Sequence, residues 1–179
     1  GVWTFGKEVN MLVPFGEVNS QWREMATERA KKINSVGLYT NIGGALEKAS
    51  QISPTSKKNA HIILLTDGMV DIDKDPSVNE KEWRRIVDEI IPMLKEQGFS
   101  VHTVALSDNA DTHLMNKLSL ATDGHAGVAK TAEELMPAFL KAFDAASPSQ
   151  QLPIAGNRFV VDSSVEEFTA LMFRDNPSD

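Results

Sequence analysis

The chain has 179 residues, and its 18 lysine and arginine residues against 25 aspartate and glutamate residues give a formal net charge of −7. A hydrophobic fraction of 41% with 24% charged residues is typical of a globular domain, while the acidic balance argues against nucleic acid as a partner. The absence of cysteine excludes thiol catalysis, iron–sulfur clusters, zinc fingers and disulfides. No apolar run approaches the roughly 18 residues that cross a bilayer.

The first third of the chain predicts a hairpin followed by two helices. Short apolar runs at Val2–Phe5 and 11–15 flank a polar turn, a spacing that predicts two antiparallel strands. Apolar residues then recur at helical spacing over residues 21–33, which predicts an amphipathic helix. A second helix is predicted over residues 41–52, before Pro54 stops it.

The remainder predicts alternating strands and helices. Residues 60–65 are apolar at every position, which is typical of a strand buried on both faces of a parallel sheet. The further predicted elements are an acidic loop at 71–79, a helix at 80–97, a buried strand at 100–106, a helix at Thr112–Ala121, a weak strand at 126–129 and a helix at Ala132–Ala146. This order predicts an α/β fold of the Rossmann-like, doubly wound type, with a mostly parallel sheet and an antiparallel edge strand.

Composition divides the chain into three parts. Residues 1–146 form the predicted domain, and residues 147–157, rich in serine, proline and glutamine, form a linker. Residues 158–179 predict a short C-terminal β segment that opens a further unit, with strands at 158–162 and 166–173. Because Gly1 is not an initiator methionine, we expect the chain to begin inside a longer gene product.

Two polar residues stand where a doubly wound sheet binds its ligands, beyond the carboxyl ends of the strands. Asp67 follows the buried strand 60–65, and Thr40 lies in a glycine-bearing loop before a helix. A hydroxyl and a carboxylate at one edge are oxygen ligands suited to Mg²⁺ or Ca²⁺. A helix N-cap is the alternative role for Thr40, and a cap of the following loop is the alternative for Asp67.

These residues belong to motifs that resemble the von Willebrand factor type A (VWA) family over about residues 1–146. The motifs are Thr40 and Asn41 within Gly-x-x-Thr-Asn-x-x-x-Ala-Leu, the strand end Thr66-Asp67-Gly68, the strand 101–106 followed by Asp111, and the turn at 118–124. In that family a metal-ion-dependent adhesion site combines an Asp-x-Ser-x-Ser motif on the first strand with a Thr and an Asp on two further loops. Thr40 and Asp67 match the second and third parts.

The resemblance implies a non-enzymatic adhesion or assembly module. Its metal, Mg²⁺ or alternatively Mn²⁺ or Ca²⁺, would be held by Thr40 and Asp67 and would bind a protein ligand that offers a carboxylate. The implied ligand-binding surface comprises Tyr39, Asn41, Gly68, Met69, Asp71, Asp108 and Asp111. A weaker likeness of the tail to bacterial cell-envelope proteins implies an extracytoplasmic location and a membrane anchor in the full-length protein.

The first motif of the family is missing here. No Asp-x-Ser-x-Ser occurs, and the chain opens at what resembles the family's second strand, Val2–Phe5. Because the first strand lies in the middle of such a sheet, we expect either an incomplete sheet or a strand supplied from elsewhere. With one hydroxyl and one carboxylate present, metal binding by this stretch alone is expected to be weak or absent.

The acidic residues allow two other interpretations. Asp71, Asp73 and Asp75 with Glu82 imitate the spacing of an EF-hand calcium loop, but Pro76 stands where that loop needs glycine. A phosphoryl-transfer enzyme of the haloacid-dehalogenase-like or receiver-like type is the alternative function, although the residues that accompany its aspartates in those families have no match.

Overall fold

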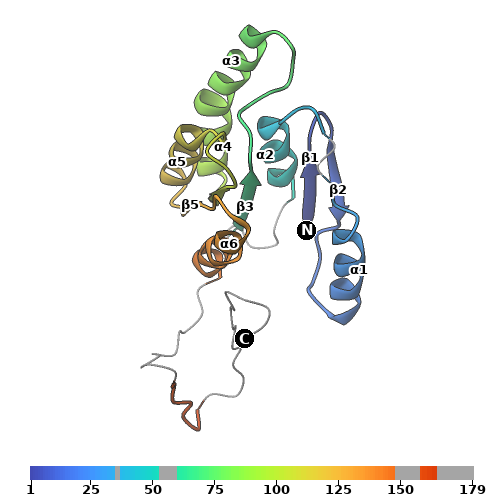
Figure 1. Ribbon diagram of the computed structural model, residues 1–179, viewed down its shortest axis with the longest axis vertical. Helices are drawn as coiled ribbons and strands as arrows, with labels where there is room; N and C mark the ends of the chain where they lie inside the picture. Colours follow the sequence, from blue (N-terminus) through green and yellow to red (C-terminus); the bar gives the residue numbers. More distant parts are fainter. Residues whose placement is uncertain (35–36, 53–59, 148–157, 165–179) are drawn as a thin grey trace.

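The computed structural model describes residues 1–34, 37–52, 60–147 and 158–164, and these residues form two separate sheets surrounded by helices (Figure 1). The smaller sheet is the predicted antiparallel hairpin of β1 (Val2–Phe5) and β2 (Val9–Val13). The second strand begins two residues earlier than predicted, because the chain turns where the Gly6 N–H donates to the Glu8 carbonyl at 3.1 Å. Pro14 then ends the strand, since it has no N–H for the ladder.

The larger sheet is parallel, as predicted, with the strand order β3-β4-β5. Its strands are β3 (Ala60–Thr66), β4 (Phe99–Ala105) and β5 (Ala126–Val128). β4 is the central strand, and six of its seven residues are buried. Helices therefore cover both faces of this sheet, which confirms the Rossmann-like α/β fold.

The helices follow the predicted order, and the largest difference in a boundary is at the start of α3. They are α1 (Ser20–Ala30), α2 (Ile42–Ser50), α3 (Pro76–Arg85), α4 (Ile91–Glu96), α5 (Thr112–Ala121) and α6 (Ala132–Ala146). The helix predicted from residue 80 begins at Pro76, because the Asp75 carboxylate accepts the Ser77 N–H at 2.9 Å and proline suits the first helical position. A π-helical turn, η1 (Ile86–Ile90), joins α3 to α4 just before Pro92, which has no N–H to donate to the helix.

Helix α1 corrects one expectation of the sequence. It was predicted as an amphipathic helix with a buried face, yet none of its residues is buried. It is tied to the hairpin by polar contacts instead, since Trp22 Nε1 donates to the Pro14 carbonyl at 2.9 Å and Arg29 Nη1 donates to the Leu12 carbonyl at 2.8 Å.

The core lies on both faces of the parallel sheet. On one face, β3 and β4 pack against α2, the α3–α4 helix and α5, through the buried residues Ile42, Leu46, Leu64, Ile86, Ile90, Leu94, Val101, Leu114 and Leu118. On the other face Val104 packs against Ala138 and Ala142 of α6. None of the described helices is both long and apolar enough to cross a membrane.

The two sheets are not joined, as the missing first strand led us to expect. Within the described residues, β1 pairs only with β2 and β3 pairs only with β4, so each has one edge without a strand partner. Helix α2 links the two parts, because it packs on β1 and β2 as well as on α3 and η1 (Figure 1). Among the described residues, no strand therefore joins β1 to β3.

Only part of the predicted C-terminal β segment can be compared with the structure, because residues 165–179 lie outside the described residues. The strand expected at 158–162 is wrong, since within 158–164 the structure has an isolated bridge at Arg158 and a turn in which the Asp162 carboxylate accepts the Ser164 N–H at 2.7 Å. The predicted strand at 166–173 and the linker residues 148–157 lie outside the described residues. The three-part division of the chain stays a prediction.

Candidate functional site

The loop that carries Thr40 is fixed by backbone bonds to the segment that follows β3. The Thr40 N–H donates to the Asp71 carbonyl at 2.6 Å, and the Asp71 N–H donates to the Thr40 carbonyl at 3.2 Å. The N-cap of α2 is Asn41, whose Oδ1 accepts the Gly44 N–H at 2.9 Å. The helix cap therefore does not use the Thr40 hydroxyl, so this alternative role is wrong.

Thr40 lies against the turn that contains Asp67. A Cβ at Gly68 would lie 2.9 Å from Thr40 Oγ1, so the missing side chain of Gly68 allows the close approach. The turn is held by two further bonds: the Gly68 N–H donates to Thr66 Oγ1 at 3.3 Å, and Ser107 Oγ donates to the Asp67 carbonyl at 2.8 Å. Asp67 itself is exposed. The structure thus brings the predicted hydroxyl next to the predicted Asp-Gly turn.

Two neighbouring aspartates are occupied by hydrogen bonds that the sequence does not reveal. Asn79 Nδ2 donates to Asp71 Oδ1 at 3.1 Å. Asp111 caps α5 by accepting the Leu114 N–H at 2.9 Å, and its second oxygen accepts Trp83 Nε1–H at 2.7 Å. The Asp111 N–H also donates to the Gly68 carbonyl at 3.4 Å, which places Asp111 beside the turn. Asn79 and Trp83 were missed because both belong to a helix and reach the site only through tertiary folding.

The remaining predicted surface residues lie around this centre with differing exposure. Met69 is 61% exposed, and Tyr39 is half-buried with Lys7 Nζ 5.9 Å from its ring centroid. Asp108 forms an exposed ion pair with Lys130 at 2.5 Å, and this carboxylate raises the pKa of Lys130. The Asp108 carboxylate is therefore bound to Lys130, in the segment just before α6.

The oxygen atoms at the site are of the type that a hard divalent cation binds, but there are too few of them to complete its coordination shell. A threonine hydroxyl and a carboxylate are oxygen ligands of the type that Mg²⁺ prefers. Within the described residues, however, no three histidine, aspartate or glutamate side chains lie together in a way that could hold a metal. Water or additional protein groups would have to fill most positions of an octahedral shell.

Comparison with known proteins identifies the family. A sequence model of the von Willebrand factor type A domain matches residues 1–142. The chain belongs to this family. Among solved structures, a von Willebrand factor type A protein from Catenulispora acidiphila is similar at 18% identity and a TM-score of 0.60, over 80% of this chain and 33% of that chain.

Two crystal structures of proximal thread matrix protein 1 from the mussel byssus are also similar. Their identities are 17% and 18%, with TM-scores of 0.55 and 0.57, over 78% and 80% of this chain and 32% and 34% of those chains. The chain thus spans about a third of the length of these solved proteins, and at such identities the likeness shows the fold alone. No curated protein matches the sequence. VWA domains are generally protein-interaction modules and typically non-enzymatic.

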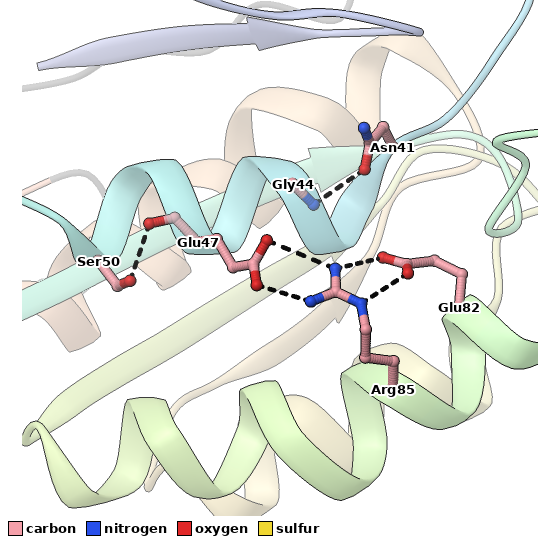
Figure 2. Close-up of polar contacts among 6 residues, drawn as sticks. All are labelled: Asn41, Gly44, Glu47, Ser50, Glu82 and Arg85. Atoms are coloured by element: carbon pink, nitrogen blue, oxygen red, sulfur yellow. Dashed lines mark hydrogen bonds and ion pairs between the residues drawn. The ribbon is translucent and has the colours of Figure 1, made fainter.

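The VWA domain fixes its Thr40 loop through an ion cluster between α2 and α3 (Figure 2). Arg85 binds the Glu82 carboxylate through Nε at 2.7 Å and Nη2 at 2.8 Å, and its Nη1 donates to Glu47 Oε1 at 2.6 Å. The two carboxylates raise the pKa of Arg85. A Cβ at Gly43 would overlap Glu82 Oε1, so a larger residue there would displace the Glu82 carboxylate from its place in this cluster. The cluster holds the first turns of α2, and with them the loop before it.

The same cluster corrects the calcium-loop interpretation. Glu82, which would be the last ligand of an EF-hand-like loop, is buried and bound to Arg85. Asp75 is used as the N-cap of α3, and this bond lowers the pKa of its carboxyl. Residues 71–82 are therefore a turn and a helix start, and not a calcium loop.

Proposed function

We propose that this VWA domain is a divalent-metal-dependent protein-binding module, used in adhesion or assembly, whose metal is coordinated by Thr40 and Asp67. Mg²⁺ is the expected ion, with Mn²⁺ or Ca²⁺ as substitutes. The supporting observation is the contact between the Thr40 hydroxyl and the Asp67–Gly68 turn at the carboxyl edge of the sheet. The bound ion would offer an open coordination position to a carboxylate of the protein ligand.

Charge supports a metal-bridged mode of binding over a direct one. The chain carries a net charge of −7, and Asp67, Asp71 and Asp111 lie at or beside the proposed site. An acidic surface repels a carboxylate, so a cation between the two is needed to make their contact favourable. Exposed Met69 and half-buried Tyr39 flank the same edge and supply apolar contact area.

Isothermal titration of Mn²⁺ and Mg²⁺ into wild type, Asp67→Asn and Thr40→Val tests the metal site. We expect weak binding by wild type and an affinity at least about tenfold lower in either variant, equivalent to about 1.4 kcal/mol. Thr40→Val removes the hydroxyl but keeps the link to Asp71, which uses backbone atoms only. Asp108→Asn is the matched control, because Asp108 is an aspartate bound to Lys130 outside the proposed ligand set. Equal Mn²⁺ binding by wild type and Asp67→Asn would contradict the proposal.

A further inference from the structure

Two histidine side chains meet on the parallel sheet, away from its carboxyl edge, and the backbone of a third histidine is bonded to one of them. His61 is the second residue of β3, His102 lies in β4, and His125 precedes β5. His61 Nδ1 lies 3.0 Å from His102 Nε2, and their ring centroids are 5.2 Å apart. The backbone N–H of His125 donates to His102 Nδ1 at 3.1 Å. His102 is 2% exposed, so both of its ring nitrogens depend on these partners.

This geometry permits only one arrangement of protons. Because His102 Nδ1 accepts a backbone N–H, its proton must be on Nε2. His102 Nε2–H then donates to His61 Nδ1, so His61 carries its own proton on Nε2. A further proton on either ring would set two donors face to face, at the His125 N–H or between the two rings. The hydrogen-bonded chain exists only while both imidazoles are neutral.

The surroundings offer little to stabilise an additional charge on His102. His102 shares its face of β4 with Val104, which packs against Ala138 and Ala142 of α6. Among the described residues, the titratable groups that act on His102 are His61 and His125. Helix α6, which packs on this face, carries Glu133, Glu134, Lys141 and Asp144, of which the first three line a groove with His125. Burial lowers the pKa of His102, and the neighbouring imidazoles of His61 and His125 lower it further by a smaller amount.

His102 also holds the turn that leads into β5. The His125 carbonyl accepts the Thr103 N–H at 2.8 Å and Ser119 Oγ–H at 3.2 Å, so the His125 backbone is bonded on both sides. The preceding Asp123 has a φ of 54°, a left-handed conformation that the surroundings must maintain. β5 contributes only three residues to the sheet. The bond to His102 is therefore one of three that hold His125 at the start of this short edge strand.

We propose that the His61–His102 pair is a proton-sensitive latch, which holds the turn before β5 while neutral and releases the His125 backbone when His102 is protonated. The proposal is independent of the metal site. An unfolded histidine titrates near pH 6.5. Since the folded pKa of His102 is lowered, the latch contributes its full stability above about pH 6.5. That stability is lost as the pH falls below this value and the unfolded or opened state takes up the proton.

Nuclear magnetic resonance of the wild-type protein tests the latch directly. Long-range ¹H–¹⁵N spectra of the imidazoles should show His102 as the Nε2–H tautomer and still mostly neutral at pH 6.5. Amide protection factors at Thr103, His125 and Ala126 should fall by up to about tenfold per pH unit between pH 6 and 5, the limit for one proton. Protection at Leu114, on the opposite face, should change less. A His102 that is charged at pH 6.5, or carries its proton on Nδ1, would overturn the proposal.

A pair of variants separates the latch from general acid sensitivity. His102→Gln offers an amide oxygen to the His125 N–H and an amide N–H to His61 Nδ1 but removes the titratable ring, so the fall in protection at His125 should be reduced at least about threefold at pH 5. His113→Gln is the control, because His113 is exposed and stacks on Trp83 outside the cluster. An equal fall in both variants would refute the role of the pair. Should His102→Gln not fold, the wild-type tautomer and titration decide the question alone.

Discussion

Replacement of Arg85 by methionine should destabilise the domain far more than the same change at its neighbour Arg84. Arg85 links Glu82 of its own helix to Glu47 of α2, and Figure 2 shows both carboxylates directed at one guanidinium. Arg84 forms an i,i+4 pair with Glu80, in which both side chains are about two-thirds exposed. Loss of Arg85 thus leaves the buried Glu82 carboxylate without a cation, whereas loss of Arg84 leaves only an exposed Glu80 carboxylate.

The magnitude follows from the exposure of the partners. The Glu82 side chain is 9% exposed, whereas those of Arg85 and Glu47 are 33% and 41% exposed. Removal of one partner from a fully buried pair costs about 3–5 kcal/mol, and an exposed pair contributes about 0–1 kcal/mol. We therefore expect Arg85→Met to cost about 2–3 kcal/mol, mostly from the uncompensated charge on Glu82, and Arg84→Met to cost less than about 0.5 kcal/mol.

Urea denaturation followed by circular dichroism measures both variants. The double variant Arg85→Met/Glu82→Gln should recover part of the loss, because a neutral amide costs less to bury than a carboxylate without its cation. An Arg85→Met protein as stable as Arg84→Met would refute the reasoning. So would a double variant less stable than Arg85→Met alone, since it would show that the charge left on Glu82 is not the cause.

Two further changes probe contacts of the core and of the site. Gly124→Ala should cost at least about 2 kcal/mol in urea denaturation, because its Cβ would overlap the Val101 carbonyl, a backbone atom in a buried strand. Gly16→Ala should change stability by less than about 0.5 kcal/mol, because its Cβ would meet only the Trp22 ring at an ordinary contact distance of 3.8 Å. Trp83→Phe removes the N–H that donates to the Asp111 carboxylate, and it should lower the free energy of unfolding by about 1.5–3 kcal/mol in the same assay. A loss of less than about 0.5 kcal/mol would show that water replaces the indole N–H as the donor.

The elements with local signals were predictable from the sequence. Helices α5 and α6 have the predicted ends, because Asp111 and Thr131 cap them through side chains that the sequence displays. The start of α3 was missed although Asp75 and Pro76 give the same kind of signal, since the loop was interpreted by its charge. α1 has helical spacing, but spacing alone does not show whether a core lies against the helix.

The two proposed metal ligands could be predicted from the sequence, but the residues that hold the neighbouring aspartates in place could not. Thr40 and Asp67 could be paired because both follow from the rule that the ligands of such folds bind at the carboxyl edge. Asn79 and Trp83 hold Asp71 and Asp111 through bonds between side chains seven or more residues apart. Such bonds leave no periodicity in the sequence. The role of Gly68 depends likewise on the position of a hydroxyl that only the tertiary structure gives.

One physical cause accounts for two features of the described residues. These features are the edges of β1 and β3 that lack a strand partner, and the small number of metal ligands at the site. β1 and β3 point in the same direction (Figure 1), and the turn with Asp67 follows the carboxyl end of β3. A strand parallel to β3 in the gap would end at the same edge, beside Thr40. It would satisfy the free backbone groups of both neighbours and bring its own terminal side chains to the site. Since both deficits are relieved by one strand, metal affinity and sheet stability should be coupled in this domain.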